Sequence, residues 1–159
     1  VLRTPLLAHR IASTKTGRMY VRLNENDRVV NVFIVNKEKS MMLASKFGHI
    51  IHFSIDEVNI LSGVGKGVMG IKLGEEDHCL GGVVISGKDD FLQVETTNGK
   101  TMDFRPGKYE VVTRGGKGFE AVKRSEFAKI IVPPIELVNW EEIADAEAQK
   151  PSSPKGLFD

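Results

Sequence analysis

An internal repeat of about fifty residues is the feature of this sequence that most limits what the chain can fold into. Residues 19–35 read MYVRLNENDRVVNVFIV, and they align at an offset of 50 with residues 69–85, which read MGIKLGEEDHCLGGVVI. Identical residues occupy four aligned positions, and hydrophobic residues fill the ends of both segments. A period near fifty with strand-like alternation is typical of propeller blades and related all-β arrays rather than of helical solenoids.

A glycine-lysine-glycine turn recurs with nearly the same period. Residues 48–72 align at an offset of 51 with residues 99–123, and this alignment superimposes the two turns at 65–67 and 116–118. Residues 15–17, Lys-Thr-Gly, stand where an earlier, degenerate copy of the turn is expected. Two complete repeat units therefore lie between three copies of the turn.

Each repeat unit carries the pattern of four main strands. The Asn98-Gly99 pair, between two alternating runs, is the strongest short signal for a β-hairpin. The second unit predicts strands at 68–73, 80–86, 91–96 and 100–104 with a shorter one at 109–113, and the first predicts strands at 19–23, 29–35, 41–46, 49–53 and 58–61. The predicted fold class is therefore all-β, with propeller-like blades of about fifty residues, of which the chain holds roughly three.

The C-terminal part of the chain differs from the repeats in composition. A last strand is expected at 127–132, and residues 140–150 have the composition of a short helix. Residues 136–159 hold six acidic and two basic residues, a net charge of −4, which leaves +5 on residues 1–135. We therefore divide the chain into blades at 1–135, as part of a larger domain, and an acidic tail at 136–159.

The sequence contains no recognisable catalytic or metal-binding arrangement. The acidic residues at 25–27 and 75–77 lack the frame of a calcium-binding loop, and we interpret them as solvated turns. His49 and His52 have no histidine counterparts in the next repeat, so both are expected to be exposed strand residues. The single cysteine, Cys79, excludes an intrachain disulfide and is expected to be a small strand side chain. No catalytic residue, metal site or cofactor is predicted.

The glycine turns are open to two interpretations. They are not nucleotide-binding P-loops, because a P-loop needs Ser or Thr after its lysine, whereas glycine follows both Lys66 and Lys117. Converging backbone N–H groups and a lysine at the tip would suit a phosphate, and a row of such turns would suit a bent nucleic-acid backbone. The alternative is that each turn is only a tight connector between blades, with its lysine in water.

Further basic residues accompany the turns. Between residues 100 and 129 the sequence has eight basic and four acidic residues. The residues that we expect to contact nucleic acid are Arg18, Arg22, Lys66, Lys72, Lys108, Arg114, Lys117, Lys123 and Arg124. Contacts of this kind neutralise backbone phosphates and do not read bases.

The order of these motifs resembles a known family. The segment VMGIKLGEEDH at 68–78 is followed by GGVVI at 81–85, by LQVETTNGK at 92–100 and by YEVVTRGGKG at 109–118. Over roughly residues 15–130 this series is similar to the blades of the C-terminal domain of bacterial type IIA topoisomerase A subunits, those of DNA gyrase or topoisomerase IV. The heptapeptide of gyrase A subunits is Q-R-R-G-G-K-G, and residues 112–118 keep only its last five letters, which resembles later blades.

The resemblance implies a β-pinwheel, a propeller-like array in which strands are exchanged between neighbouring blades. It implies a module without catalysis of its own that binds, bends and wraps double-stranded DNA, within an ATP-dependent, gyrase-like topoisomerase of the bacterial cytoplasm and nucleoid. The implied partners besides DNA are the ATPase B subunit of that topoisomerase and the remainder of its A subunit. It also implies that this chain, which begins at Val1, holds the last blades of a longer protein, and that its acidic tail competes with DNA.

A second hypothesis from the residues is a protein-interaction propeller fragment that docks another subunit through its rim or through an open sheet edge. A third hypothesis, a glycan- or small-molecule-binding propeller, is disfavoured because aromatic residues, which would stack on sugars, make up only 7 % of the chain. The DNA and protein hypotheses differ in salt sensitivity, because binding to DNA phosphates weakens steeply as salt is raised.

Overall fold

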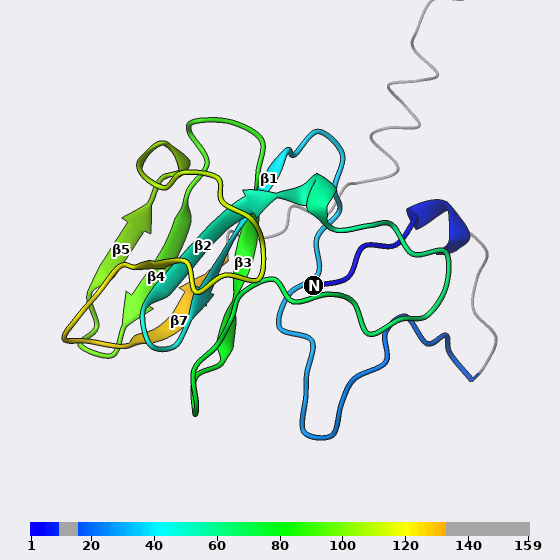
Figure 1. Ribbon diagram of the computed structural model, residues 1–159, viewed down its shortest axis with the longest axis horizontal. Coiled ribbons are helices and arrows are strands. Elements are labelled where there is room, and N and C mark those ends of the chain that lie inside the picture. Colours follow the sequence, from blue (N-terminus) through cyan, green and yellow to red (C-terminus); the bar gives the residue numbers. More distant parts are fainter. Residues whose placement is uncertain (10–15, 133–159) are drawn as a thin grey trace, which may run out of the picture.

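Two antiparallel β-sheets organise the computed structural model, which describes residues 1–9 and 16–132 (Figure 1). The larger sheet, here called blade 1, has the order β3-β1-β2-β6 and consists of β1 (Ser40–Ser45), β2 (His49–Ser54), β3 (Cys79–Ile85) and β6 (Phe119–Glu120). The smaller sheet, blade 2, has the order β5-β4-β7 and consists of β4 (Leu92–Thr96), β5 (Thr101–Phe104) and β7 (Phe127–Ile131). The predicted all-β fold class is confirmed.

Each blade is built on a hairpin from one repeat unit. In blade 1, β1 pairs with β2, and in blade 2, β4 pairs with β5 across the predicted Asn98-Gly99 turn. The outer strand of each blade, β3 or β7, comes from further along the chain and pairs with the first strand of the hairpin. The register of the outer strand shifts between Ala44 and Ser45 in blade 1 and between Glu95 and Thr96 in blade 2. These positions are equivalent at an offset of 51, so both blades have the same register shift at the same place in the repeat.

Strand exchange joins the two blades. Strand β6 follows the blade 2 hairpin in sequence, yet it pairs with β2 of blade 1, where Phe119 lies opposite Ile50 and Glu120 opposite His49. The chain then returns to blade 2 and forms β7. This exchange is the arrangement that the resemblance to β-pinwheel domains implies.

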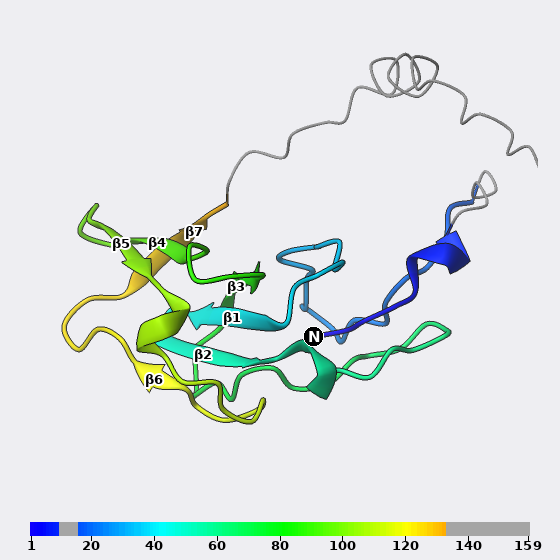
Figure 2. The same cartoon turned by 90° about the horizontal axis from the view of Figure 1, so that it is seen from above.

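The main hydrophobic core lies between the two blades, which Figure 2 shows as two layers. Met42, Ala44 and Ile50 of blade 1 belong to the same buried cluster as Leu92, Val94, Phe104 and Phe127 of blade 2. A second buried cluster contains the alternate residues of the blade 1 hairpin, Leu43, Ile51 and Phe53, with Val58 and Ile71. Blade 1 is therefore buried on both faces, because side chains of a strand point alternately to its two sides.

Short 3-10 helices follow the hairpins at equivalent places. The helix η2 (Ile55–Glu57) follows β2, and η3 (Pro106–Lys108) follows β5 at an offset of 51. The Ser54 side chain begins η2 by accepting a hydrogen bond from the Asp56 backbone N–H at 3.3 Å. A further 3-10 helix, η1 (Leu6–His9), lies near the N-terminus.

Five of the predicted strands are wrong: those at 19–23, 29–35, 58–61, 68–73 and 109–113 are not strands. Several of these segments make single backbone contacts in place of a ladder. Val21 and Ile60 each form one isolated bridge, and the backbone N–H of Val112 donates to the carbonyl of His52 at 2.8 Å. Alternation in sequence predicts an extended chain, but a strand also needs a partner over several consecutive residues.

The prediction that His52 is exposed is also wrong, since only 4 % of its surface is accessible. Its Nδ1 atom lies 2.8 Å from the carbonyl oxygen of Tyr109, and its Nε2 atom lies 2.8 Å from the Ser40 hydroxyl. His52 lies on the same face of the hairpin as Met42 and Ile50, so its side chain points toward the core between the blades and not to solvent. His49, at the start of β2, is half-buried.

The predicted tail at 136–159 and the helix expected at 140–150 lie outside the described residues. Among residues 1–9 and 16–132, none of the helices is long and apolar enough to cross a membrane.

Candidate nucleic-acid interface

The three glycine turns share one backbone conformation. Gly17, Gly67 and Gly118 have φ angles of 78°, 79° and 73°, a region that glycine adopts at little cost. A Cβ atom at Gly67 would overlap the carbonyl oxygen of Val1, and one at Gly118 would overlap that of Ile50. The last glycine of each complete turn is therefore required both by its own φ angle and by the backbone against which it packs.

The turns bring together basic residues from successive repeats. The carbonyl of Gly65 accepts a hydrogen bond from the backbone N–H of Arg22 at 2.9 Å, and that of Gly116 accepts one from Lys72 at 2.8 Å. Arg22 thus lies beside the turn that holds Lys66, and Lys72 lies beside the turn that holds Lys117. Each cation comes from the repeat before its turn.

The lysines of this pairing are exposed. The Lys66 ammonium donates to the side-chain oxygen of Asn24 at 3.2 Å, which holds it near the Arg22 segment. Within the described part of the chain, no carboxylate lies within ion-pair distance of Lys66, Lys72 or Lys117. Their charges are therefore available to an anion.

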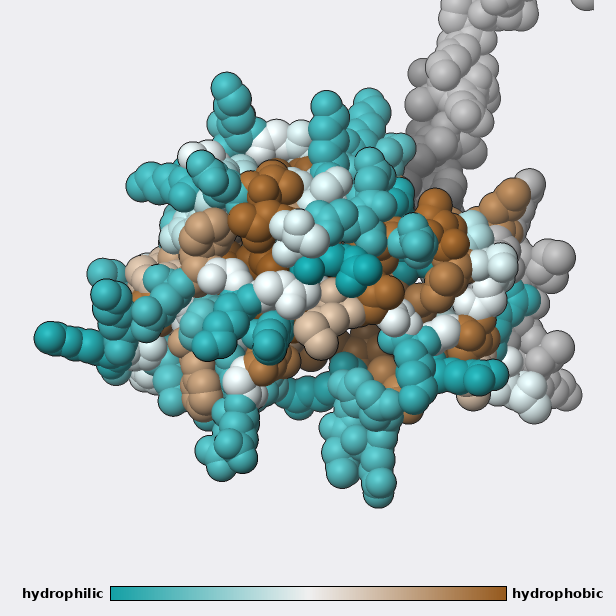
Figure 3. Space-filling model, viewed as in Figure 1, coloured by the Kyte–Doolittle hydropathy of each residue, from teal (hydrophilic) through white to brown (hydrophobic). Residues whose placement is uncertain are grey.

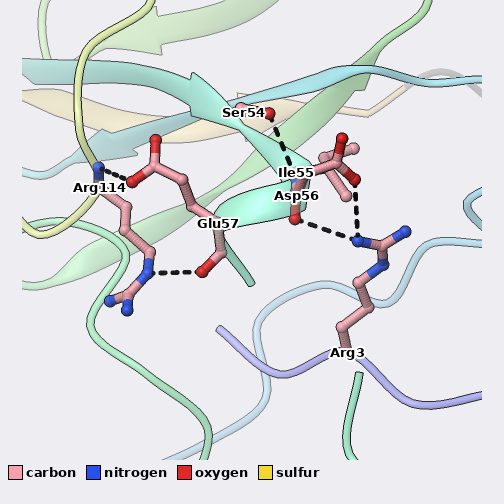
Figure 4. A network of polar contacts seen from close by, with 6 residues as sticks. All are labelled: Arg3, Ser54, Ile55, Asp56, Glu57 and Arg114. Carbon is pink, nitrogen blue, oxygen red and sulfur yellow. Dashed lines mark hydrogen bonds and ion pairs between the residues drawn. The ribbon is translucent and has the colours of Figure 1, made fainter. Parts of the chain in front are cut away.

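Arg114 is placed differently from the other predicted contacts, because it is half-buried and bonded within the protein. Its Nε donates to the carbonyl of Glu57 at 2.9 Å, and its Nη1 donates to the carbonyl of Met69 at 3.1 Å. Figure 4 shows the Glu57 carboxylate accepting the backbone N–H of Arg114 at 3.0 Å. The same view shows Arg3 reaching Ile55 and Asp56 on η2. The Arg114 side chain thus joins the glycine turn at 116–118 to the helix η2, which follows the blade 1 hairpin.

The remaining predicted contacts, Arg18, Lys108, Lys123 and Arg124, are all exposed. Lys123 and Arg124 line a cleft together with Lys100, which follows the β4–β5 turn. The sequence-based selection of contacts omits Lys100, although the Asn98-Gly99 hairpin signal places it directly after a turn. Only the structure brings it beside a loop more than twenty residues further along the chain.

The acidic segments form matching turns, as expected. Asn26 and Glu76 have positive φ angles of 62° and 60°, and Glu75 and Glu76 are exposed. Asp77 does more than face solvent, because its carboxylate accepts the backbone N–H of Phe47 at 3.0 Å. Among the residues that the structure describes, no three His, Cys, Asp or Glu side chains are grouped for a metal ion.

Cys79 is a half-buried residue at the start of β3, as predicted for a small strand side chain. Burial raises the pKa of its thiol above the usual value, so the thiol is protonated at neutral pH. A protonated thiol is a poor nucleophile.

The fold and this surface define a class: an all-β array of strand-exchanging blades whose connections carry exposed basic residues. The family model of the DNA gyrase C-terminal domain, a β-propeller, matches residues 10–36 and 39–86. The A subunit of DNA gyrase from Helicobacter pylori (strain 26695) is 34 % identical over 111 residues, which cover 69 % of this chain and 13 % of the relative. The A subunit of DNA topoisomerase 4 from Bacillus subtilis is 25 % identical over 118 residues, or 74 % of this chain and 14 % of the relative.

Solved structures agree on the fold. The C-terminal domain of DNA topoisomerase IV aligns with a TM-score of 0.70 at 24 % identity, covering 79 % of this chain and 41 % of that one. The Escherichia coli ParC C-terminal domain aligns with a TM-score of 0.54 at 18 % identity, covering 69 % and 47 %. The chain belongs to the family of C-terminal domains of type IIA topoisomerase A subunits, those of DNA gyrase and topoisomerase IV. It spans about one seventh of the length of the curated relatives it matches.

Proposed function

We propose that this chain binds double-stranded DNA through the backbone phosphates and bends it, as a non-catalytic part of a type IIA topoisomerase. The observation that carries the proposal is the recurrent pairing of a basic residue with a lysine turn, Arg22 with the turn at 65–67 and Lys72 with the turn at 116–118. Equivalent cation pairs on successive repeats suit successive phosphates of one duplex. The proposed partners are an ATPase B subunit together with the remainder of the topoisomerase chain, in the bacterial cytoplasm at the nucleoid.

The test is binding of this chain to a fluorescent duplex as salt is raised, with the K66A/K117A variant beside the wild type. We expect the log–log salt slope of the wild type to be steep, and the variant to lower its magnitude by about two, since each phosphate contact contributes about 0.9. The thermal midpoint should not change, because both lysines are exposed. The variant K37A/K88A removes the same charge from two other exposed lysines and serves as the control.

Two results would contradict parts of this proposal. A wild-type chain that does not bind duplex at about 50 mM salt, or binds it without salt dependence, contradicts the DNA proposal. If the wild type binds and K66A/K117A matches the control, the two turns are only connectors between blades.

A second candidate function is docking of another protein, and exposed hydrophobic residues favour it. Val32 and Ile34, in the segment equivalent to β3, are 83 % and 74 % exposed. Exposed hydrophobic surface also appears over the N-terminal segments in Figure 3. Binding to a protein through such residues is expected to persist at high salt, in contrast to DNA binding.

A further inference from the structure

A cleft of about 350 Å³ lies between the tips of two connections. One wall is the β4–β5 turn, which contributes Thr96, Asn98 and Lys100. The other wall is the loop between β6 and β7, which contributes Lys123, Arg124 and Ser125. The two walls are far apart in sequence, and both belong to the end of blade 2 at which β4 ends and β7 begins.

The charge in this cleft is uncompensated. Lys100, Lys123 and Arg124 are exposed, and within residues 1–9 and 16–132 none of them forms an ion pair. No acidic residue lines the cleft among the described residues. The carboxylates next to lining residues have partners of their own: Glu126 pairs with Lys46 at 3.5 Å, Glu95 pairs with Lys129 at 3.0 Å, and Asp103 accepts a hydrogen bond from the Gln93 side chain at 2.7 Å.

The backbone around the cleft is held by hydrogen bonds, so the walls are in place before a ligand arrives. The buried Thr96 hydroxyl donates to the Lys100 carbonyl at 3.0 Å, and the Lys100 backbone N–H donates back to that hydroxyl at 3.1 Å. The backbone N–H of Thr97 donates to the carbonyl of Glu126 at 2.9 Å, which ties one wall to the other. A pre-formed site loses less entropy on binding than a flexible one.

The side chains that remain available in the cleft are mostly donors. Two ammonium groups and one guanidinium carry charge, while the Asn98 amide and the Ser125 hydroxyl supply neutral donors. A phosphate group matches this set, since it presents several acceptor oxygens and negative charge.

We propose that this cleft binds a phosphate group of the DNA backbone. The inference rests on the proposed DNA-binding function and adds a contact that does not belong to a glycine turn. Lys117 and Lys123 are six residues apart, so their backbones are separated by at most about 20 Å. One turn of duplex, about 34 Å long, is long enough to reach both.

The test compares K100A/K123A/R124A with K37A/K39A/K88A in this chain, by binding to a fluorescent duplex between about 50 and 200 mM salt. The control removes three exposed lysine side chains that do not line the cleft. Lys39 lies at the end of blade 1 where β1 begins and β3 ends, since its backbone N–H donates to the Ile85 carbonyl. We expect the cleft variant to lower the magnitude of the salt slope by about one, because the cleft holds one phosphate, and the affinity at low salt by more than about tenfold. The control should keep the salt slope and the affinity of the wild type, and circular dichroism checks that both variants fold.

Two results would overturn the inference. In the first, the wild type binds duplex with a steep salt slope and the cleft variant behaves like the control, which leaves DNA binding intact and removes the cleft from it. In the second, inorganic phosphate at constant ionic strength shifts the NMR signals of the Lys123 and Arg124 amides while the variant keeps the wild-type slope. The cleft would then be a site for free phosphate and not for DNA. A wild type that fails to bind duplex contradicts the proposed function itself.

Discussion

Blade 1 and blade 2 hold the loop before their outer strand by the same hydrogen bond, yet the two loops carry opposite charge. The backbone N–H of Lys46 donates to the carbonyl of His78 in blade 1, and that of Thr97 donates to Glu126 in blade 2, both at 2.9 Å. The blade 1 loop presents Glu75, Glu76 and Asp77, whereas the blade 2 loop presents Lys123 and Arg124.

The comparison separates what a repeat preserves from what it leaves free to change. Hydrogen bonds between backbone atoms do not depend on the side chains, so the loop stays attached to the hairpin tip whatever its charge. The exposed side chains of the loop alter the local potential at little structural cost. The repeat therefore predicts where a binding surface lies, and the individual residues decide whether an anion is attracted to it.

The largest expected effect is a loss of stability at the start of the outer strand of blade 2. Cys79 of blade 1 and Phe127 of blade 2 occupy equivalent positions there, but they differ in packing. Phe127 is 1 % exposed and its ring lies 5.6 Å from that of Phe104, while Cys79 is half-buried. We expect F127A to lower the free energy of unfolding by about 3–5 kcal/mol and C79A by less than about 1.5 kcal/mol. Denaturant unfolding of both variants measures this, and equal losses would contradict the assigned difference in packing.

An intermediate effect is expected at Arg114, whose counterpart in the first complete turn is Gly63. Because its guanidinium donates to two backbone carbonyls, we expect R114A to lower the free energy of unfolding by about 2 kcal/mol. The affinity of the folded variant for DNA should fall less than that of K66A/K117A. A variant with unchanged stability and strongly weakened DNA binding would instead place Arg114 among the phosphate contacts.

The smallest expected effect is on DNA affinity, and it tests whether the acidic loop of blade 1 repels the duplex. Replacing Glu75 and Glu76 by glutamine removes two exposed carboxylates and keeps the shape of the turn. We expect E75Q/E76Q to tighten binding to duplex by about two- to threefold at low salt, with the gain lost at high salt. The variant D89N/E110Q removes two other exposed carboxylates and is the control. Equal affinities of the two variants would show that the acidic loop does not act locally on DNA.

Much of the fold follows from the sequence because its signals are local. The sequence predicts the four hairpin strands, the turn at Asn98-Gly99 and the period of the glycine turns close to their observed positions. Turn chemistry and alternation act over a few neighbouring residues, so they do not need a partner to be recognised.

The failures of prediction involve long-range partners. The segment 29–35 has the same apolar pattern as β3, but among the described residues it has no hairpin to pair with and is not a strand. The lack of a histidine counterpart in the next repeat predicts an exposed His52, but this residue lies on the face of its sheet that carries the main core. The hydrophobic pattern of one segment does not indicate which distant segment pairs with it or packs on it.

The sequence by itself determined the repeat, the all-β class, the hairpins and the glycines that the turns require, since each depends on local backbone geometry. The tertiary structure alone decided that β6 crosses to blade 1, that Arg114 is bonded within the protein and that Lys100 joins Lys123 and Arg124 around one cleft. These are contacts between residues distant in the chain, and their free energy exists only when the blades have packed together.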